Sequence, residues 1–165
     1  MKKVILIFLW ATMFCNASVL AEGWTGEVGY MNVGDSDIDL GALYGIVGYE
    51  VDHSDSYSST LELLVGFGVQ DDSLTVLSTK VDIELDSAFG LGYKGTFNID
   101  DAWSVYYRAM YAQMDLSADV LGISVGADES DFGAGIGVTF KHVTVGYLKF
   151  FGDLDVDAIT IAYKF

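Results

Sequence analysis

The 165-residue chain contains no proline, a single cysteine (Cys15) and few basic residues. One cysteine excludes a disulfide framework and a cysteine-based zinc site, and the lack of proline suits a chain made almost entirely of β-ladder. Eight Lys and Arg stand against 24 Asp and Glu, giving a net charge of −16. This charge argues against nucleic-acid binding, which needs basic residues for the phosphates. The 52% hydrophobic content excludes intrinsic disorder, and the length predicts one domain.

The first 21 residues have the features of a cleaved export signal. A basic start, Met1-Lys2-Lys3, precedes a mostly apolar run from Val4 to Cys15, and Val19-Leu20-Ala21 matches the small-x-small cleavage pattern. We therefore predict a signal peptide over residues 1–21 and one exported domain over residues 22–165. A retained membrane anchor is the alternative, but the apolar run is short for a spanning helix.

The rest of the sequence alternates with a period of two, which is typical of β-strands. In the clearest stretch, Val81, Ile83, Leu85, Phe89 and Leu91 share one face, while the other face carries charged or small residues. Longer connections are expected around Gln70–Thr79 and Asp115–Ser130. The two faces of Val143–Phe151 are similarly apolar, so its orientation stays open. Eight strands are expected, over 24–33, 38–51, 57–70, 80–97, 103–111, 131–140, 143–151 and 158–165.

Alternation alone does not decide which face of a barrel is outside. Glycine is common on the small face, for example Gly66, Gly90 and Gly135, and glycine suits a narrow lumen better than a solvated surface. Aromatic residues also gather at the strand ends expected on one rim, as in the girdle of a membrane barrel. We therefore predict that the bulky face meets lipid. The predicted girdle comprises Trp24, Tyr49, Tyr57, Tyr93, Phe97, Trp103 and Phe140.

The C-terminal segment Ile159–Phe165 alternates apolar and aromatic residues and ends in phenylalanine. With these features, residues 22–165 resemble the small outer-membrane β-barrels of Gram-negative bacteria, such as the transmembrane domain of outer membrane protein A and outer membrane protein X. The resemblance implies an all-β, eight-stranded antiparallel up-and-down transmembrane β-barrel in the cell outer membrane, reached through the periplasm. It implies that Ile161, Tyr163 and Phe165 form the insertion signal read by the barrel-assembly machinery. It also implies contact with outer-membrane lipid and lipopolysaccharide, and we expect a monomer.

Four charged residues fall on the predicted inner face: Glu27, Glu62, Lys94 and Arg108. Their positions near the same strand ends place them at comparable depths. Because buried charges need partners, we predict an ion network that fills the lower lumen as a structural plug. A gate or narrow ion path is the functional alternative.

No catalytic, metal or cofactor site is expected. Asp35, Asp37 and Asp39 have the spacing of a calcium loop, but the required glycine and bidentate glutamate are missing. His53 and His142 fall in predicted periplasmic turns. These turns are far from the outer rim, where those small outer-membrane barrels that are enzymes carry their histidine. We predict a non-enzymatic envelope-structural or surface-contact role. A small pore, a lipid A-modifying enzyme and a soluble periplasmic barrel carrying an apolar ligand are the alternatives.

Overall fold

The computed structural model describes residues 23–165 except 36–37, 77–78, 121–122 and 153–154. Residues 1–21, the predicted signal peptide, lie outside the described residues. No helix among the described residues has the length and apolarity to cross a membrane. The strands are β1 Trp24–Gly34, β2 Asp39–His53, β3 Tyr57–Gln70, β4 Asp72–Val76, β5 Thr79–Asn98, β6 Trp103–Val120, β7 Ile123–Phe140, β8 Val143–Phe151 and β9 Asp157–Lys164.

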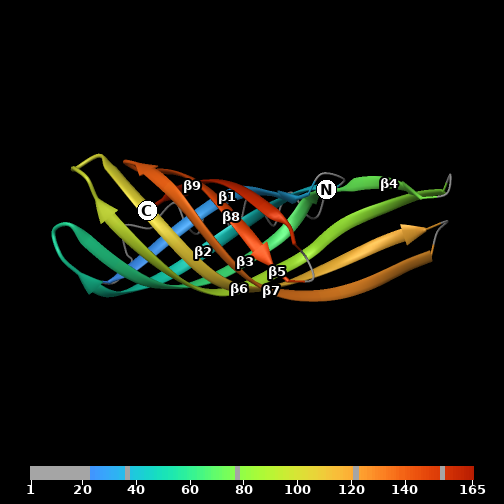
Figure 1. Ribbon diagram of the computed structural model, residues 1–165, viewed down its shortest axis with the longest axis horizontal. Coiled ribbons are helices and arrows are strands. Elements are labelled where there is room, and N and C mark those ends of the chain that lie inside the picture. Colours follow the sequence, from blue (N-terminus) through green and yellow to red (C-terminus); the bar gives the residue numbers. More distant parts are fainter. Residues whose placement is uncertain (1–22, 36–37, 77–78, 121–122, 153–154) are drawn as a thin grey trace.

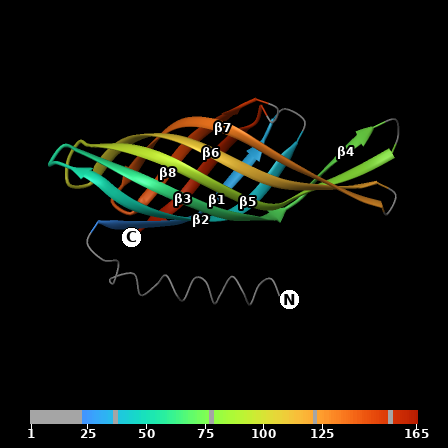
Figure 2. The ribbon, with the colours of Figure 1, turned by 90° about the horizontal axis from the view of Figure 1, so that it is seen from below.

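These strands form one closed antiparallel barrel (Figures 1 and 2). Neighbours in the ring follow the order β3-β2-β1-β9-β8-β7-β6-β5, and β3 closes the ring by pairing with β5 from Tyr57↔Phe97 to Gly66↔Ala88. β4 continues the path of β3 along β5, from Asp72↔Ile83 to Val76↔Thr79. β3 and β4 therefore act as one interrupted strand. This architecture confirms the predicted eight-stranded up-and-down barrel.

Part of the sheet projects beyond the barrel, at the right of Figures 1 and 2. β6 and β7 stay paired up to Val120↔Ile123, whereas β8 leaves β7 at Phe132↔Phe151. We call the projecting part the extension: β4, Thr79–Leu85, Asp115–Val120 and Ile123–Ser130. The prediction of a long connection over 115–130 is wrong, because this segment forms the outer halves of β6 and β7. Most of the predicted connection over 70–79 likewise belongs to β4 and β5.

The barrel wall turns bulky side chains outward and small or polar ones inward. Leu91, for example, is 60% exposed on the outer face, whereas Met110 and Thr144 are buried inside. β8, whose orientation the sequence left open, turns Leu148 and Phe150 inward and Val145 outward. The predicted assignment of the bulky face to the outside is therefore confirmed for the barrel wall.

A β-bulge in β5 breaks the alternation that the sequence suggested. Leu85 pairs with Leu116 and Ser87 pairs with Asp115, so Asp86 is an extra residue on this strand. An extra residue reverses the facing of everything beyond it. Leu85 is only 1% exposed and belongs to the core, whereas Phe89 faces outward. The prediction that Val81, Ile83 and Leu85 share the outward face of Phe89 is wrong for this reason.

Candidate functional site

The barrel register brings four charged side chains together in the lower lumen. Glu27 on β1, Glu62 on β3, Lys94 on β5 and Arg108 on β6 are all buried. Lys94 and Arg108 are direct cross-strand neighbours, and Glu62 pairs with Gly92 two positions away on the same face. The four residues that the sequence placed on the inner face therefore lie in one cluster.

Hydrogen bonds join the two acids and two bases of this cluster, called the lumen network below, and their formal charges cancel. Arg108 donates from Nε to Glu62 Oε2 at 2.6 Å, and from Nη2 to Glu62 Oε1 at 3.0 Å and Glu27 Oε2 at 2.9 Å. Lys94 donates from Nζ to the other oxygen of Glu27. Arg108 thus bridges two carboxylates, one of them in the bidentate arrangement that favours arginine over lysine. Pairing two acids with two bases offsets the cost of removing these charges from water.

Tyr106 covers the lumen network with its ring. Lys94 Nζ lies 4.4 Å and Arg108 Cζ lies 5.3 Å from the ring centroid, within the range of cation–π attraction. The Tyr106 hydroxyl lies against Gly137 on β7 and Gly146 on β8, where an added Cβ would overlap it. Tyr106 was not predicted from the sequence. The sequence did contain a signal. Tyr106 is a large residue at an inward position of β6, and glycines occupy inward positions of β7 and β8.

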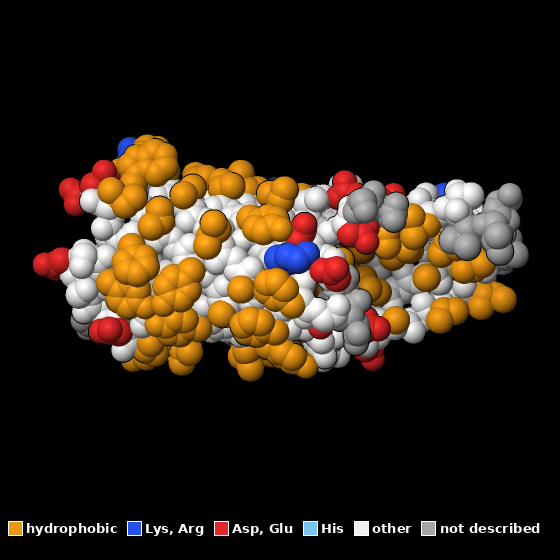
Figure 3. Space-filling model, viewed as in Figure 1, with side chains coloured by type: hydrophobic (Ala, Val, Ile, Leu, Met, Phe, Trp, Pro, Cys, Tyr) orange, Lys and Arg blue, Asp and Glu red, His pale blue; other side chains and the backbone are white. Residues whose placement is uncertain are grey.

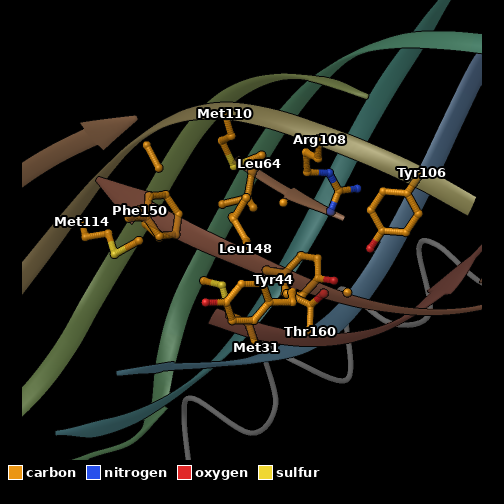
Figure 4. Close-up of a pocket in the computed structure, with 15 residues that line it drawn as sticks. Met31, Tyr44, Leu64, Tyr106, Arg108, Met110, Met114, Leu148, Phe150 and Thr160 are labelled. Carbon is orange, nitrogen blue, oxygen red and sulfur yellow. The ribbon is translucent and has the colours of Figure 1, made fainter. Parts of the chain in front are cut away.

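An apolar layer lies next to the lumen network, on the side toward the extension. Figure 4 shows side chains of this layer converging from different strands across the lumen. They enclose a cavity of only about 20 Å³, which is room for about one water molecule. The buried hydroxyls of Tyr44 and Tyr106 have no hydrogen-bond partner among the described residues. The layer includes Met31, Leu64, Met110, Met114, Leu148 and Phe150.

The predicted aromatic girdle surrounds the turn end of the barrel in contacting pairs. Trp24 meets Tyr49 with ring centroids 5.4 Å apart, and Trp103 meets Phe140 at 4.6 Å. Tyr57 packs on Phe97 at 5.0 Å, and its hydroxyl lies 3.0 Å from that of Tyr93. Figure 3 shows large apolar side chains spread over the barrel wall, with acidic groups towards each end.

The C-terminal residues lie at the seam between β9 and β1. Ile161 and Tyr163 face outward, and the Phe165 amide donates to the Gly26 carbonyl at 3.0 Å. The ring of Tyr163 lies between those of His142, at 5.3 Å, and Phe165, at 5.7 Å. Their use as an insertion signal stays a prediction.

The outer rim carries an acidic hollow of about 620 Å³. Its described lining includes five aspartates and one base, Lys149, which contacts Asp155 at 3.0 Å and Asp157 at 3.4 Å. Within the described ranges, no three His, Cys, Asp or Glu side chains converge to hold a metal. Asp37 lies outside those ranges. The histidines have structural contacts: His53 Nδ1 lies 3.0 Å from Glu50, and His142 Nδ1 lies 3.0 Å from the Lys164 carbonyl oxygen.

Comparison with known proteins finds no matching family model and no matching curated protein. Solved structures do match over nearly the whole described chain. Ail, the attachment invasion locus protein of Yersinia pestis, aligns with a TM-score of 0.53 and 15% identity, over 88% of this chain and 100% of Ail. The chain has the fold of a small outer-membrane β-barrel.

Two further small outer-membrane barrels share this fold. The N-terminal β-barrel domain of Pseudomonas aeruginosa OprF has a TM-score of 0.53 at 11% identity, covering 86% of this chain and 97% of the domain. Neisserial surface protein A has a TM-score of 0.52 at 14% identity, covering 87% and 95%. The resemblance proposed from the C-terminal pattern and the alternation is therefore confirmed at the level of fold.

Proposed function

We propose that the chain is an integral protein of the Gram-negative outer membrane with a non-enzymatic envelope-structural or surface-contact role. The observation that carries the membrane part is a change of polarity along the outer face of β6 and β7. Outward residues are apolar up to Tyr111 and Phe132, which are cross-strand partners. The next outward pair, Gln113 and Ser130, is polar.

This shared boundary has the height expected for a lipid–water interface. The apolar stretch of β6 runs from Trp103 to Tyr111, close to the roughly 9–11 residues that a tilted membrane strand needs. The girdle residues mark its other edge. Beyond the boundary the outward residues are polar, as in Ser117, Asp119 and Ser124. Lipid against the barrel wall and water against the extension account for this pattern.

The filled lumen supports a structural or contact role over a pore. An ion would have to pass a hydrogen-bonded charge layer and then an apolar layer that encloses only about 20 Å³. The same small volume leaves no room for a carried ligand. The proposed role therefore belongs to the surface of the barrel. The extension is the part that reaches furthest past the proposed lipid–water interface.

The proposal is tested by gel mobility and by surface labelling. The protein is expected in the outer-membrane fraction, with a mobility that shifts on boiling. Ser124→Cys on the extension should react with a membrane-impermeant maleimide on intact cells, whereas Ser54→Cys in the opposite turn should react only after lysis. Recovery in the soluble periplasmic fraction without a boiling shift would overturn the proposal, and labelling of Ser54→Cys alone would reverse the orientation.

A further inference from the structure

The inner face of the extension is an apolar surface. Cross-strand pairing aligns Leu74, Val81, Val120 and Ile123 in one row across β4, β5, β6 and β7. The adjacent row on the same face carries Ile83, Ala118 and Val125, with Asp72 as its acidic end on β4. The opposite face of the same strands is polar, with a matching row of Ser73, Asp82, Asp119 and Ser124.

The barrel end of this face is covered, because Ile83 packs against the buried core and Asp72 accepts a hydrogen bond from the Asp39 amide. Its β7 part, at Ile123 and Val125, has no opposing layer among the described residues. β8 stops pairing with β7 at Phe132, and β1, β2 and β9 end near the acidic hollow. Ile123 is 68% exposed and Val125 is 60% exposed. An apolar sheet face normally packs against a second layer, and a contiguous exposed apolar surface marks a contact site. Figure 3 shows apolar side chains exposed on the extension at the right of the view.

The surroundings of this face determine which partner fits it. The neighbouring hollow is lined by Asp35, Asp39, Asp72, Asp155 and Asp157, and Lys149 is the base among its described lining. The inner face of β7 continues toward the barrel with Glu129. A negative rim beside an apolar face favours a ligand with basic and apolar sides, because complementary charge steers and orients association.

We propose that the inner face of the extension binds an amphipathic, cationic polypeptide segment of another protein. The apolar side of the segment packs on the two rows, and its Lys and Arg side chains face the acidic rim. This inference rests on the proposed function, which places the extension outside the membrane. A second copy fits poorly, because it would set two acidic rims together, and lipid chains lie below the polarity boundary at Gln113 and Ser130.

The test uses the full barrel refolded in zwitterionic lipid nanodiscs, with empty nanodiscs as the reference. The probe is a synthetic amphipathic Lys/Leu peptide, compared with Glu/Leu and Lys/Ser peptides of the same length. We expect saturable binding of the Lys/Leu peptide, and at least about tenfold weaker binding of the other two. Equal binding of all three, or no binding beyond empty nanodiscs, would overturn the inference.

Paired variants localise the binding. Ile123→Ser with Val125→Ser on the inner face should weaken Lys/Leu binding by about tenfold or more. Ser124→Ala with Gly126→Ala, on the outer face of the same strand, should leave it within about twofold. An unchanged boiling shift verifies that each variant is folded.

Three outcomes of the variant measurements would also overturn the inference. They are equal binding by the two variants, a Lys/Leu dissociation constant that the inner-face change leaves unaltered, and self-association of the wild type that the inner-face change abolishes. Because maleimide labelling of Ser124→Cys tests the proposed location independently, the inference can fail while the proposed function stands.

Discussion

Replacing Arg108 by methionine tests whether the lumen network holds the barrel together. Among the described residues, Arg108 is the base that donates hydrogen bonds to Glu62. Arg108 and Lys94 both donate to Glu27. Arg108→Met would therefore leave Glu62 as a buried carboxylate without its partner. Removing one member of a buried ion pair typically costs about 3–5 kcal/mol of the free energy of unfolding.

Urea unfolding of the barrel from lipid vesicles measures this cost. Trp24 and Trp103, in the girdle, report unfolding by fluorescence, and gel mobility gives an independent readout. If the free energy of unfolding falls by about 2 kcal/mol per molar urea, a loss of about 4 kcal/mol lowers the urea concentration at the unfolding midpoint by about 2 M. The control is Lys80→Met, which breaks an exposed pair with Asp82 and should cost less than about 1 kcal/mol.

A double variant separates a lost charge partner from lost packing. Glu62→Gln added to Arg108→Met removes the unpaired charge and leaves Glu27 with Lys94, so the double variant should be more stable than Arg108→Met alone. The reasoning would be refuted if Arg108→Met unfolded within about 1 kcal/mol of the wild type. A double variant less stable than Arg108→Met would refute it too, since the two side chains would then contribute separately.

Three further predictions use the same unfolding assay. Gly146→Ala should lower the free energy of unfolding by about 1–3 kcal/mol, because the added Cβ would overlap the Tyr106 hydroxyl. Adding Tyr106→Phe should restore part of this loss. Gly126→Ala, whose added Cβ would lie 3.9 Å from its nearest neighbour, should be tolerated. Leu85→Ala should cost about 2–5 kcal/mol and more than Leu91→Ala, because only Leu85 is turned into the core by the bulge; equal costs would contradict the bulge. Leu91→Arg should cost about 2–4 kcal/mol in bilayers, and a change near zero would contradict a lipid-facing wall.

The barrel wall and the lumen network could be predicted from the sequence because each depends on strict alternation. Glu62 and Lys94 keep their place on the inner face as long as no residue is inserted between them and the turn end. The bulge at Asp86 could not be predicted, since Leu85 and Phe89 alternate smoothly through it in the sequence. Only the pairing with Asp115 and Leu116 on β6 reveals the extra residue.

The orientation of β8 was undecided for a different reason. Its two faces are similarly apolar, and the choice depends on what the neighbouring strand offers. Phe150 pairs with Gly133 and Leu148 with Gly135, so large inward side chains fill the space that the glycines leave. Complementary volume across a strand pair, which no single strand contains, decides the facing.

The outer halves of β6 and β7 were predicted as a connection, whereas residues 80–85 of the extension were correctly predicted as strand. The sequence of the extension still alternates, but the apolar positions change role along the strand. On β6, the inward positions Met110 and Met114 lie in a covered lumen, and the same inward series continues to Ala118 and Val120 beyond the barrel. One apolar face therefore runs from the sealed lumen to the exposed extension. It is covered by opposing strands within the barrel, and the proposed cationic partner would cover it outside.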